Sequence, residues 1–170
     1  MTVQTQDTGK AVSSVIAQSW HRCSKFMQRE TWQTPHQAQG LTFDSICRRK
    51  TALLTIGQAA LEDAWEFMDG RPCALFILDE SACILSRCGE PQTLAQLAAL
   101  GFRDGSYCAE SIIGTCALSL AAMQGQPINT AGDRHFKQAL QPWSFCSTPV
   151  FDNHGRLVAW WRINPAPTFP

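Results

Sequence analysis

The chain has 170 residues, of which 45% are apolar and 16% charged, and its formal net charge is zero. This length predicts one domain with an extension, and the apolar fraction is sufficient for a core. The balanced charge disfavours a nucleic-acid interface, which normally carries a basic surplus. The polar N-terminus lacks the apolar segment of a signal peptide, and no run of about 18 apolar residues is present. We therefore expect a cytoplasmic protein without a membrane span.

Eight cysteines are spread through the chain, and no two of them form a Cys-x-x-Cys pair. Most lie among aliphatic residues, where a free thiol behaves as a small hydrophobic group. Without metal-ligand spacing or a secretory signal, we expect reduced structural thiols, no metal and no cofactor.

The N-terminal region, residues 11–70, has helical periodicity. Apolar spacing predicts a helix over residues 11–28, a polar connection over residues 29–44, and a second helix over residues 45–68. Residues 1–10 are expected to be disordered. The second helix carries an apolar stripe formed by Leu54, Leu61, Trp65 and Met68. This stripe could bind a partner or a second subunit, or it could pack onto its own domain, and the pattern leaves both open.

The period changes at Pro72, and a domain is expected over residues 71–163. Predicted strands alternate with helices, and the order indicates an α+β fold with a single antiparallel sheet whose helices cover one face. The strands are expected at Cys73–Leu78, which would be buried on both faces, and at Ala82–Leu85, Trp143–Phe151 and Arg156–Trp161. The helices are expected at Pro91–Leu100, at Ile112–Met123 and, capped by Asp133, at Arg134–Leu140.

No sequence motif supports catalysis. The chain lacks phosphate-binding glycine loops, zinc-ligand spacing and a nucleophile elbow. Cys146 with His135 is the best available nucleophile and base, and Cys83 with Cys88 is the one close cysteine pair for thiol chemistry. Neither arrangement carries more than proximity in sequence, so we expect no catalytic residues and a protein that is not an enzyme.

The segment from Gly105 to Ala117 is a glycine-bracketed polar loop that enters an apolar helix. Glu110 lies near the predicted helix start, where the helix dipole favours a carboxylate. The polar residues of this segment and its neighbours could line a ligand pocket, or they could simply hold the loop against the helix. The candidate pocket residues are Tyr107, Cys108, Glu110, Thr115, His135 and Cys146.

Three stretches then reveal a family resemblance: GSYCAESIIGTCALSLAAMQGQPI, DRHF and WSFCSTPVFDNHGRL, together with SWHRC from Ser19 to Cys23. They resemble the GAF-type N-terminal sensory domain of bacterial sigma-54-type enhancer-binding activators, above all of those that control dihydroxyacetone kinase genes. The resemblance implies a GAF/PAS-like sheet, and a sensory domain that regulates separate ATPase and helix-turn-helix domains. It also implies a homodimer that binds dihydroxyacetone kinase subunits and does not itself contact DNA. A GAF domain that senses a small molecule is the alternative.

The last residues depart from this family pattern. Residues 159–170 contain two tryptophans and end with three prolines in six residues, which cannot continue a helix. We expect an irregular tail over residues 164–170, and we hypothesise a truncated or frameshifted reading frame.

Overall fold

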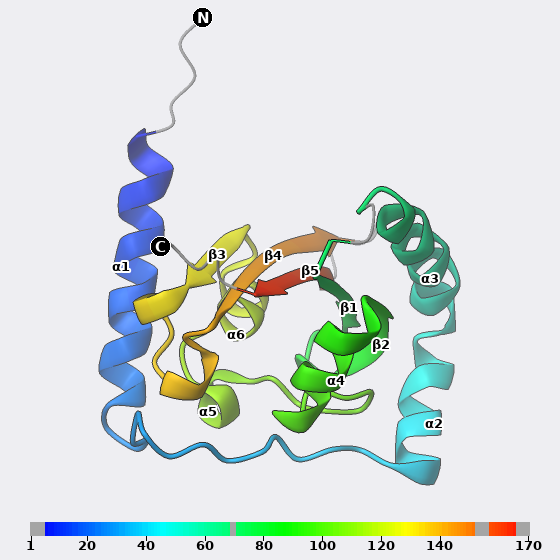
Figure 1. The fold of residues 1–170 in the computed structure, drawn as a ribbon, viewed down its shortest axis with the longest axis horizontal. Helices are drawn as coiled ribbons and strands as arrows, with labels where there is room; N and C mark the ends of the chain where they lie inside the picture. Colours follow the sequence, from blue (N-terminus) through cyan, green and yellow to red (C-terminus); the bar gives the residue numbers. More distant parts are fainter. Residues whose placement is uncertain (1–5, 69–70, 152–156, 166–170) are drawn as a thin grey trace, which may run out of the picture.

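The fold is built around one antiparallel sheet (Figure 1). A computed structural model describes residues 6–68, 71–151 and 157–165. Five strands lie in the order β2-β1-β5-β4-β3, and every neighbouring pair is antiparallel. The strands are β1 (Ala74–Leu78), β2 (Ile84–Gly89), β3 (Ile128–Ala131), β4 (Trp143–Phe151) and β5 (Leu157–Pro165). The predicted single antiparallel sheet with flanking helices is confirmed.

The helices frame this sheet. They are α1 (Gln6–Cys23), α2 (Gly40–Arg49), α3 (Thr51–Glu66), α4 (Pro91–Ala99), α5 (Glu110–Ile113) and α6 (Ala117–Gln124), with the short 3-10 turns η1 (Gly132–Arg134) and η2 (Gln138–Leu140). In Figure 1, α1 stands at one side of the molecule and α2 and α3 at the other, joined by an extended segment that crosses the base of the domain.

Strand β1 shows that both faces of the sheet are covered beside it. All five of its residues are buried, as expected from its continuous apolar sequence. Phe76 and Leu78 belong to the larger core cluster, whereas Leu75 and Ile77 belong to a smaller cluster with Leu61 of α3. Alternate residues of a strand point to opposite faces, so helices lie on both sides of the sheet. The prediction of helices on one face was therefore wrong.

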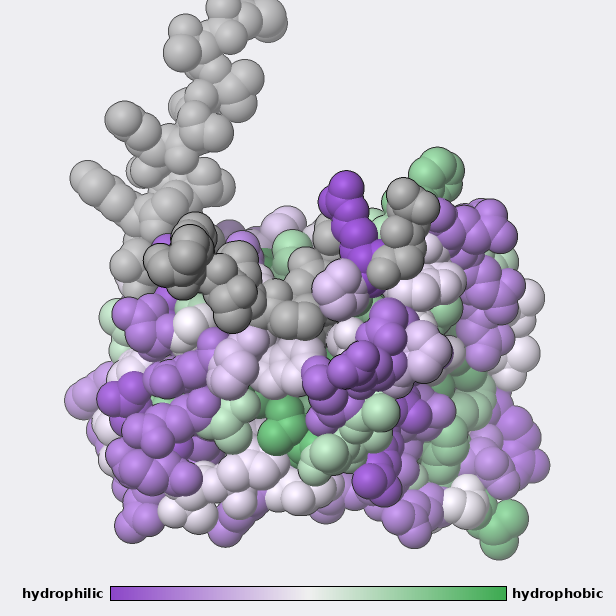
Figure 2. Space-filling view, viewed as in Figure 1, coloured by the Kyte–Doolittle hydropathy of each residue, from purple (hydrophilic) through white to green (hydrophobic). Residues whose placement is uncertain are grey.

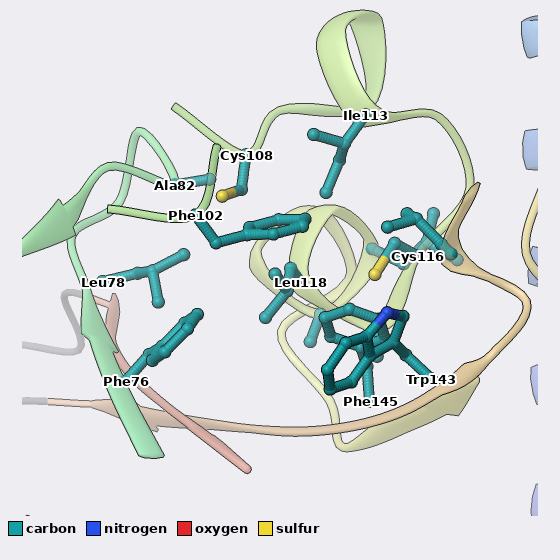
Figure 3. Packing of buried hydrophobic residues seen from close by; sticks show 14 of the residues in the cluster. Phe76, Leu78, Ala82, Phe102, Cys108, Ile113, Cys116, Leu118, Trp143 and Phe145 are labelled. Carbon is teal, nitrogen blue, oxygen red and sulfur yellow. The ribbon is translucent and has the colours of Figure 1, made fainter. Parts of the chain in front are cut away.

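The larger cluster lies between the sheet and helix α6 (Figure 3). Helix α6 is apolar around most of its circumference, and Leu118 and Leu120 are fully buried, as expected for a helix with little solvent-facing surface. Phe102, from the loop after α4, and Phe145, from β4, meet in this core with ring centroids 6.0 Å apart.

Two predicted helices are each divided into two. The helix expected over residues 45–68 is interrupted at Lys50, whose backbone leaves the helical region at φ −108° and ψ 19°. The helix expected over Ile112–Met123 is interrupted at Gly114, with φ 75° and ψ −161°. That conformation is essentially restricted to glycine, so Gly114 ends α5 and the chain restarts as α6 at Ala117.

The region between α6 and β4 also differs from its prediction. Asp133 does not cap a helix over Arg134–Leu140; it lies inside the turn η1, and η2 forms separately. Strand β3 was missed, although Ile128 and Thr130 alternate with exposed Asn129 in the period of a half-buried strand. The four residues of β3 are too few for that alternation to stand out in the sequence.

Several helices and strands begin or end at other residues than predicted. Helix α1 begins at Gln6, inside the stretch expected to be disordered, and ends at Cys23. Strand β2 begins at Ile84 because Ala82 adopts a positive φ of 60° in a tight turn. Strand β5 extends to Pro165 and pairs with both β1 and β4, so residues 164 and 165 are not irregular. The connection between the last two predicted strands, Arg156 at the start of the last one, and the tail from residue 166 lie outside the described residues.

Candidate functional site

Glu110 lies at the centre of a buried polar cluster between α1 and α5. Its side chain is brought there because Ala109 is extended and α5 starts directly after it. Arg22 donates from Nε to Oε1 at 2.7 Å and from Nη2 to Oε2 at 2.8 Å. Ser19 Oγ donates to Oε2 at 2.7 Å. One carboxylate therefore accepts three hydrogen bonds from α1.

The electrostatics of this cluster favour a charged pair. Burial would by itself raise the pKa of Glu110, but hydrogen bonds from Arg22 and Ser19 and the charge of Arg22 together hold that pKa below its ordinary value. The same hydrogen bond raises the pKa of Arg22. Glu110 is thus ionised at neutral pH, and a carboxylate that is only 9% exposed depends on the guanidinium above it.

Thr115 extends the cluster into the space between α5 and α6. Its Oγ1 lies 2.7 Å from Ser19 Oγ and 3.6 Å from Cys23 Sγ, and all three residues are fully buried. Ser19 has a single hydroxyl proton, which it gives to Glu110, so Thr115 donates to Ser19. The chain of donors therefore runs from Thr115 through Ser19 to Glu110.

Trp20 forms a second attachment of α1 to the domain. Its Nε1 donates to the carbonyl of Arg134 at 3.0 Å, and its ring meets Phe136 edge-on at 5.3 Å. The guanidinium of Arg29 lies 4.5 Å from the centre of the indole, within the range of a cation–π contact. The C-terminal half of α1 is thereby fixed to η1 and to the residues that follow it.

His135 belongs to a different buried group. Its Nε2 lies 2.8 Å from Thr130 Oγ1, which also accepts a hydrogen bond from the backbone nitrogen of Ala117 at 2.8 Å. Its Nδ1 has no hydrogen-bond partner among the described residues. Burial lowers the pKa of His135 to about 4, so the ring is neutral at physiological pH. It ties β3 to the residues preceding β4 and does not reach Glu110 through any described hydrogen bond.

The structure keeps Cys146 apart from His135. Phe145 is buried and presents its ring to the His135 imidazole at 5.2 Å, whereas Cys146, the next residue of β4, is exposed. Neighbouring residues of a strand point to opposite faces, so the thiol and the imidazole lie on different sides of the sheet. They form no nucleophile–base pair.

The remaining predicted pocket residues are also separated. Tyr107 stacks on His36 at 4.8 Å beside the smaller core cluster, while Cys108 is buried in the larger one. Of the six candidates, the structure brings Glu110 and Thr115 into one cluster. Sequence reasoning missed Ser19, Arg22 and Cys23 as their partners. A polar Ser19 within the apolar face of the first helix was the available signal.

The cysteine pair considered for redox chemistry is not arranged for it. Cys83 precedes β2 and Cys88 lies within it, and a strand rises roughly 3.3 Å per residue, which places them beyond disulfide reach. Burial raises the pKa of Cys83 to about 12 and also raises that of Cys88. Both thiols are therefore protonated and poorly nucleophilic at neutral pH.

The apolar stripe predicted on residues 45–68 faces the chain's own sheet. Leu61 is 2% exposed, and Leu54 and Trp65 pack against the same cluster, while Met68 is half-buried. The exposed apolar side chains of this region are others, Ile56 of α3 at 73% and Phe67 after it at 85%. Hydrophobic surface is visible along the side formed by α2 and α3 in Figure 2, among hydrophilic residues.

An open cleft of about 710 Å³ runs along α2, and no sequence pattern predicted it. One wall is α2, with Ser45 and Arg49, and the other is the turn between β1 and β2, with Asp79 and Glu80. Lys50 bridges the walls through its ion pair with Glu80. The charges of the cleft are therefore largely matched within it.

Two further features of the described residues bear on function. No group of three or more His, Cys, Asp or Glu side chains within residues 14–68 and 71–150 is placed to hold a metal ion. None of the helices in the part of the chain that the structure describes is long and apolar enough to cross a membrane.

The chain forms an α+β domain with one antiparallel sheet between helices, and a polar cluster lies at the start of the short helix α5. The family model described as GAF domain matches residues 52–160, and the chain belongs to this family.

Individual relatives narrow the comparison. The chain is 87% identical over 157 residues to a glycerol metabolism operon regulatory protein of Citrobacter freundii, covering 92% of this chain and 24% of that protein. It is 69% identical over 150 residues to the PTS-dependent dihydroxyacetone kinase operon regulatory protein of Escherichia coli strain K12, covering 88% and 24%. The chain thus spans about a quarter of these curated relatives.

A solved structure has the same fold. The crystal structure of the E. coli DhaR(N)-DhaL complex matches with a TM-score of 0.88 at 65% identity. The match covers 92% of this chain and 54% of that one.

Proposed function

We propose that this chain is the sensory domain of a sigma-54-type transcriptional activator that controls genes of dihydroxyacetone and glycerol metabolism. In this role it binds dihydroxyacetone kinase subunits in the cytoplasm as a homodimer, and the ATPase and DNA-reading functions belong to other domains. The observation that carries the proposal is the match at 65% identity to a protein crystallised with DhaL. An identity of 65% with a TM-score of 0.88 supports the same kind of partner for this chain.

The buried cluster supports a protein signal over a small metabolite. A polar ligand at this site would have to bind Glu110 and Thr115. Both side chains already form hydrogen bonds with α1, Glu110 with Ser19 and Arg22, and Thr115 with Ser19. A ligand at this place would have to replace those donors, and its net binding energy would be correspondingly small. We place the partner surface on the outside of the domain, with α3 as the first candidate because Ile56 and Phe67 are exposed there.

Domain exchange tests this proposal in cells. The matching region of the E. coli relative is replaced by residues 14–158 of this chain, and a reporter of the dihydroxyacetone kinase operon is measured with and without the kinase subunit DhaL. We expect the exchanged protein to retain the response to DhaL. Loss of the response, with normal protein levels, would contradict the proposal.

The matched control uses the matching region of a more distant relative. The corresponding region of the acetoin dehydrogenase operon activator of Bacillus subtilis is 24% identical to this chain, and we expect its exchange to abolish the response. A response that survives this second exchange would show that the domain is not what senses the kinase subunit, and the proposal would fall.

A further inference from the structure

Helix α1 covers the cluster in which the sequence predicted a ligand pocket. Its residues Ser19, Arg22 and Cys23 occupy the space beside Glu110 and Thr115. The chain itself therefore supplies the groups that this polar site binds. Because they come from a helix outside the sheet, displacement of α1 would leave every strand pairing in place.

The contacts that hold α1 differ in kind from those of the core helices. Of its residues from Ser14 onward, Ser19 and Cys23 are fully buried, and Ile16 is the one aliphatic residue of that part in the buried core. Partly buried Val15 and Trp20 pack against that core, and polar contacts of Ser19, Trp20 and Arg22 complete the attachment. Helix α6, by contrast, buries Leu118 and Leu120 completely. Local stability follows buried apolar contact, so α1 is held less firmly than α6.

The segment after α1 is fixed independently. Lys137 Nζ donates to the carbonyls of Gln28 and Thr31 at 2.6 and 2.8 Å, and the backbone nitrogen of Gln138 donates to the carbonyl of Arg29 at 3.0 Å. Farther on, Trp32 Nε1 donates to the carbonyl of Leu100 at 3.1 Å. The segment is therefore anchored. Residues 24–27, a turn over residues 24–26 followed by Met27, connect it to α1 and include the exposed Phe26.

The ion pair is placed where it can control α1. Arg22 retains 39% of its side-chain exposure, so salt and solvent reach it, while the Glu110 side chain is at 10%. Loss of Arg22 would leave a nearly buried carboxylate without its counter-ion, which is more costly than the loss of an exposed pair. In Figure 1, the N-terminal end of α1 projects beyond the sheet, so the contacts described above lie towards its C-terminal end.

We propose that α1 is a reversible plug, which the Arg22–Glu110 pair holds over the Glu110–Thr115 site and which pivots at residues 24–27 to open that site. In the closed state the polar groups of the site are satisfied by α1. In the open state the Glu110 carboxylate and the Thr115 hydroxyl face solvent, together with the surface that Trp20 covered. The opening is local and leaves the sheet and α6 intact.

Thiol labelling measures this opening directly. Cys23, the last residue of α1, is fully buried, and Cys108 and Cys116 are fully buried in the main core, so one labelling experiment contains its own reference. The folded chain is treated with a maleimide, quenched over time and analysed by peptide mass mapping, with rates normalised to the unfolded chain. We expect Cys23 to react at least tenfold faster than Cys108 and Cys116. Equal rates at all three thiols would overturn the proposal, because α1 would then release only when the whole domain unfolds.

Substitution of Arg22 tests whether the Arg22–Glu110 ion pair controls the opening of α1. Arg22→Gln is expected to raise the Cys23 rate a further fivefold or more and to leave Cys108 and Cys116 unchanged. Lys25→Ala is the matched control, since it removes a charge from the exposed turn after α1 without touching Glu110. A rate for Cys23 that is the same in Arg22→Gln and in Lys25→Ala would contradict the role of the pair. If Arg22→Gln failed to fold, 0.5 M salt on the unmodified chain would replace it, with faster Cys23 labelling expected and no salt effect counting against the proposal.

Discussion

Arg22 and Glu110 lie 88 residues apart in sequence and meet in a two-point ion pair, with N–O distances of 2.7 and 2.8 Å. The pair joins the N-terminal helix to the start of α5 across the boundary between the helical extension and the sensory fold. It also explains why Glu110 is tolerated at 9% exposure. A single guanidinium thus links the position of α1 to the polar centre of the domain.

Removal of this guanidinium is expected to lower the stability of the domain. Arg22→Ala leaves the buried carboxylate with Ser19 as its remaining side-chain donor. Breaking a fully buried ion pair would cost more, but Arg22 is partly exposed to solvent. We therefore expect the free energy of unfolding to fall by about 1–2 kcal/mol. Urea denaturation followed by tryptophan fluorescence measures it. Lys25→Ala should change stability by less than about 0.5 kcal/mol, and equal effects of the two variants would contradict this assignment.

His135 is expected to titrate far below an ordinary histidine. Burial lowers its pKa to about 4 from 6.5, so the neutral ring is favoured in the folded state. A depressed folded-state pKa contributes stability that is fully present above the unfolded value and is lost as the pH falls from about 6.5 towards 4. NMR titration of the imidazole measures the pKa, and urea unfolding at pH 7 and pH 5 measures its consequence. A midpoint for His135 near 6.5 would contradict the buried, neutral ring.

Gly114 and Gly132 offer a test of the break between α5 and α6. Gly114→Ala would place a β-carbon 3.4 Å from the side chains of Phe136 and Lys137, at a backbone conformation that alanine strongly disfavours. We expect a loss of about 2–3 kcal/mol in the free energy of unfolding. Gly132→Ala meets no atom within 4 Å and has only a positive φ of 57° to overcome, so about 1 kcal/mol is expected. Urea denaturation of both variants compares them, and the reverse order would show that α5 and α6 are joined differently.

Helix α3 has an inner and an outer side that mutation should separate. Leu61→Ala removes a side chain that is 2% exposed and is expected to cost about 2–5 kcal/mol in the free energy of unfolding. Ile56→Ala removes one that is 73% exposed and should cost less than about 0.5 kcal/mol in the isolated domain at low concentration. Thermal or urea unfolding distinguishes the two. A large loss for Ile56→Ala that depends on protein concentration would reveal a subunit interface on that side.

Local sequence pattern predicted the elements that have a strong period or a clear boundary. Strand β4 has the expected bounds, and Pro91 marks the start of α4 as it does in the structure. The broken helices were not predictable from periodicity, because Gly114 interrupts an apolar run whose spacing continues on both sides. The continuous apolar sequence of β1 implied that something covers both faces of the sheet beside it. That α3 covers the second face could be seen only in the tertiary structure.

The polar site shows a different limit. Glu110 and Thr115 were identifiable from a loop that enters a helix, and both lie in the cluster that the structure shows. Their partners come from Ser19 and Arg22, and no local pattern links residues that are about ninety positions apart. His135 and Cys146 are near in sequence, yet the alternation of β4 turns the thiol to the other face.

The most direct test of the proposed function is calorimetric titration of this chain with purified DhaL. The E. coli DhaR(N) fragment serves as the positive control, and circular dichroism establishes that this chain is folded. We predict saturable binding with a defined stoichiometry, weakened by Phe67→Glu or Ile56→Glu on the exposed side of the α3 region. No heat of binding from the folded chain, while the control fragment binds under the same conditions, would contradict the account and would assign DhaL recognition to the part of the relatives that lies beyond this domain.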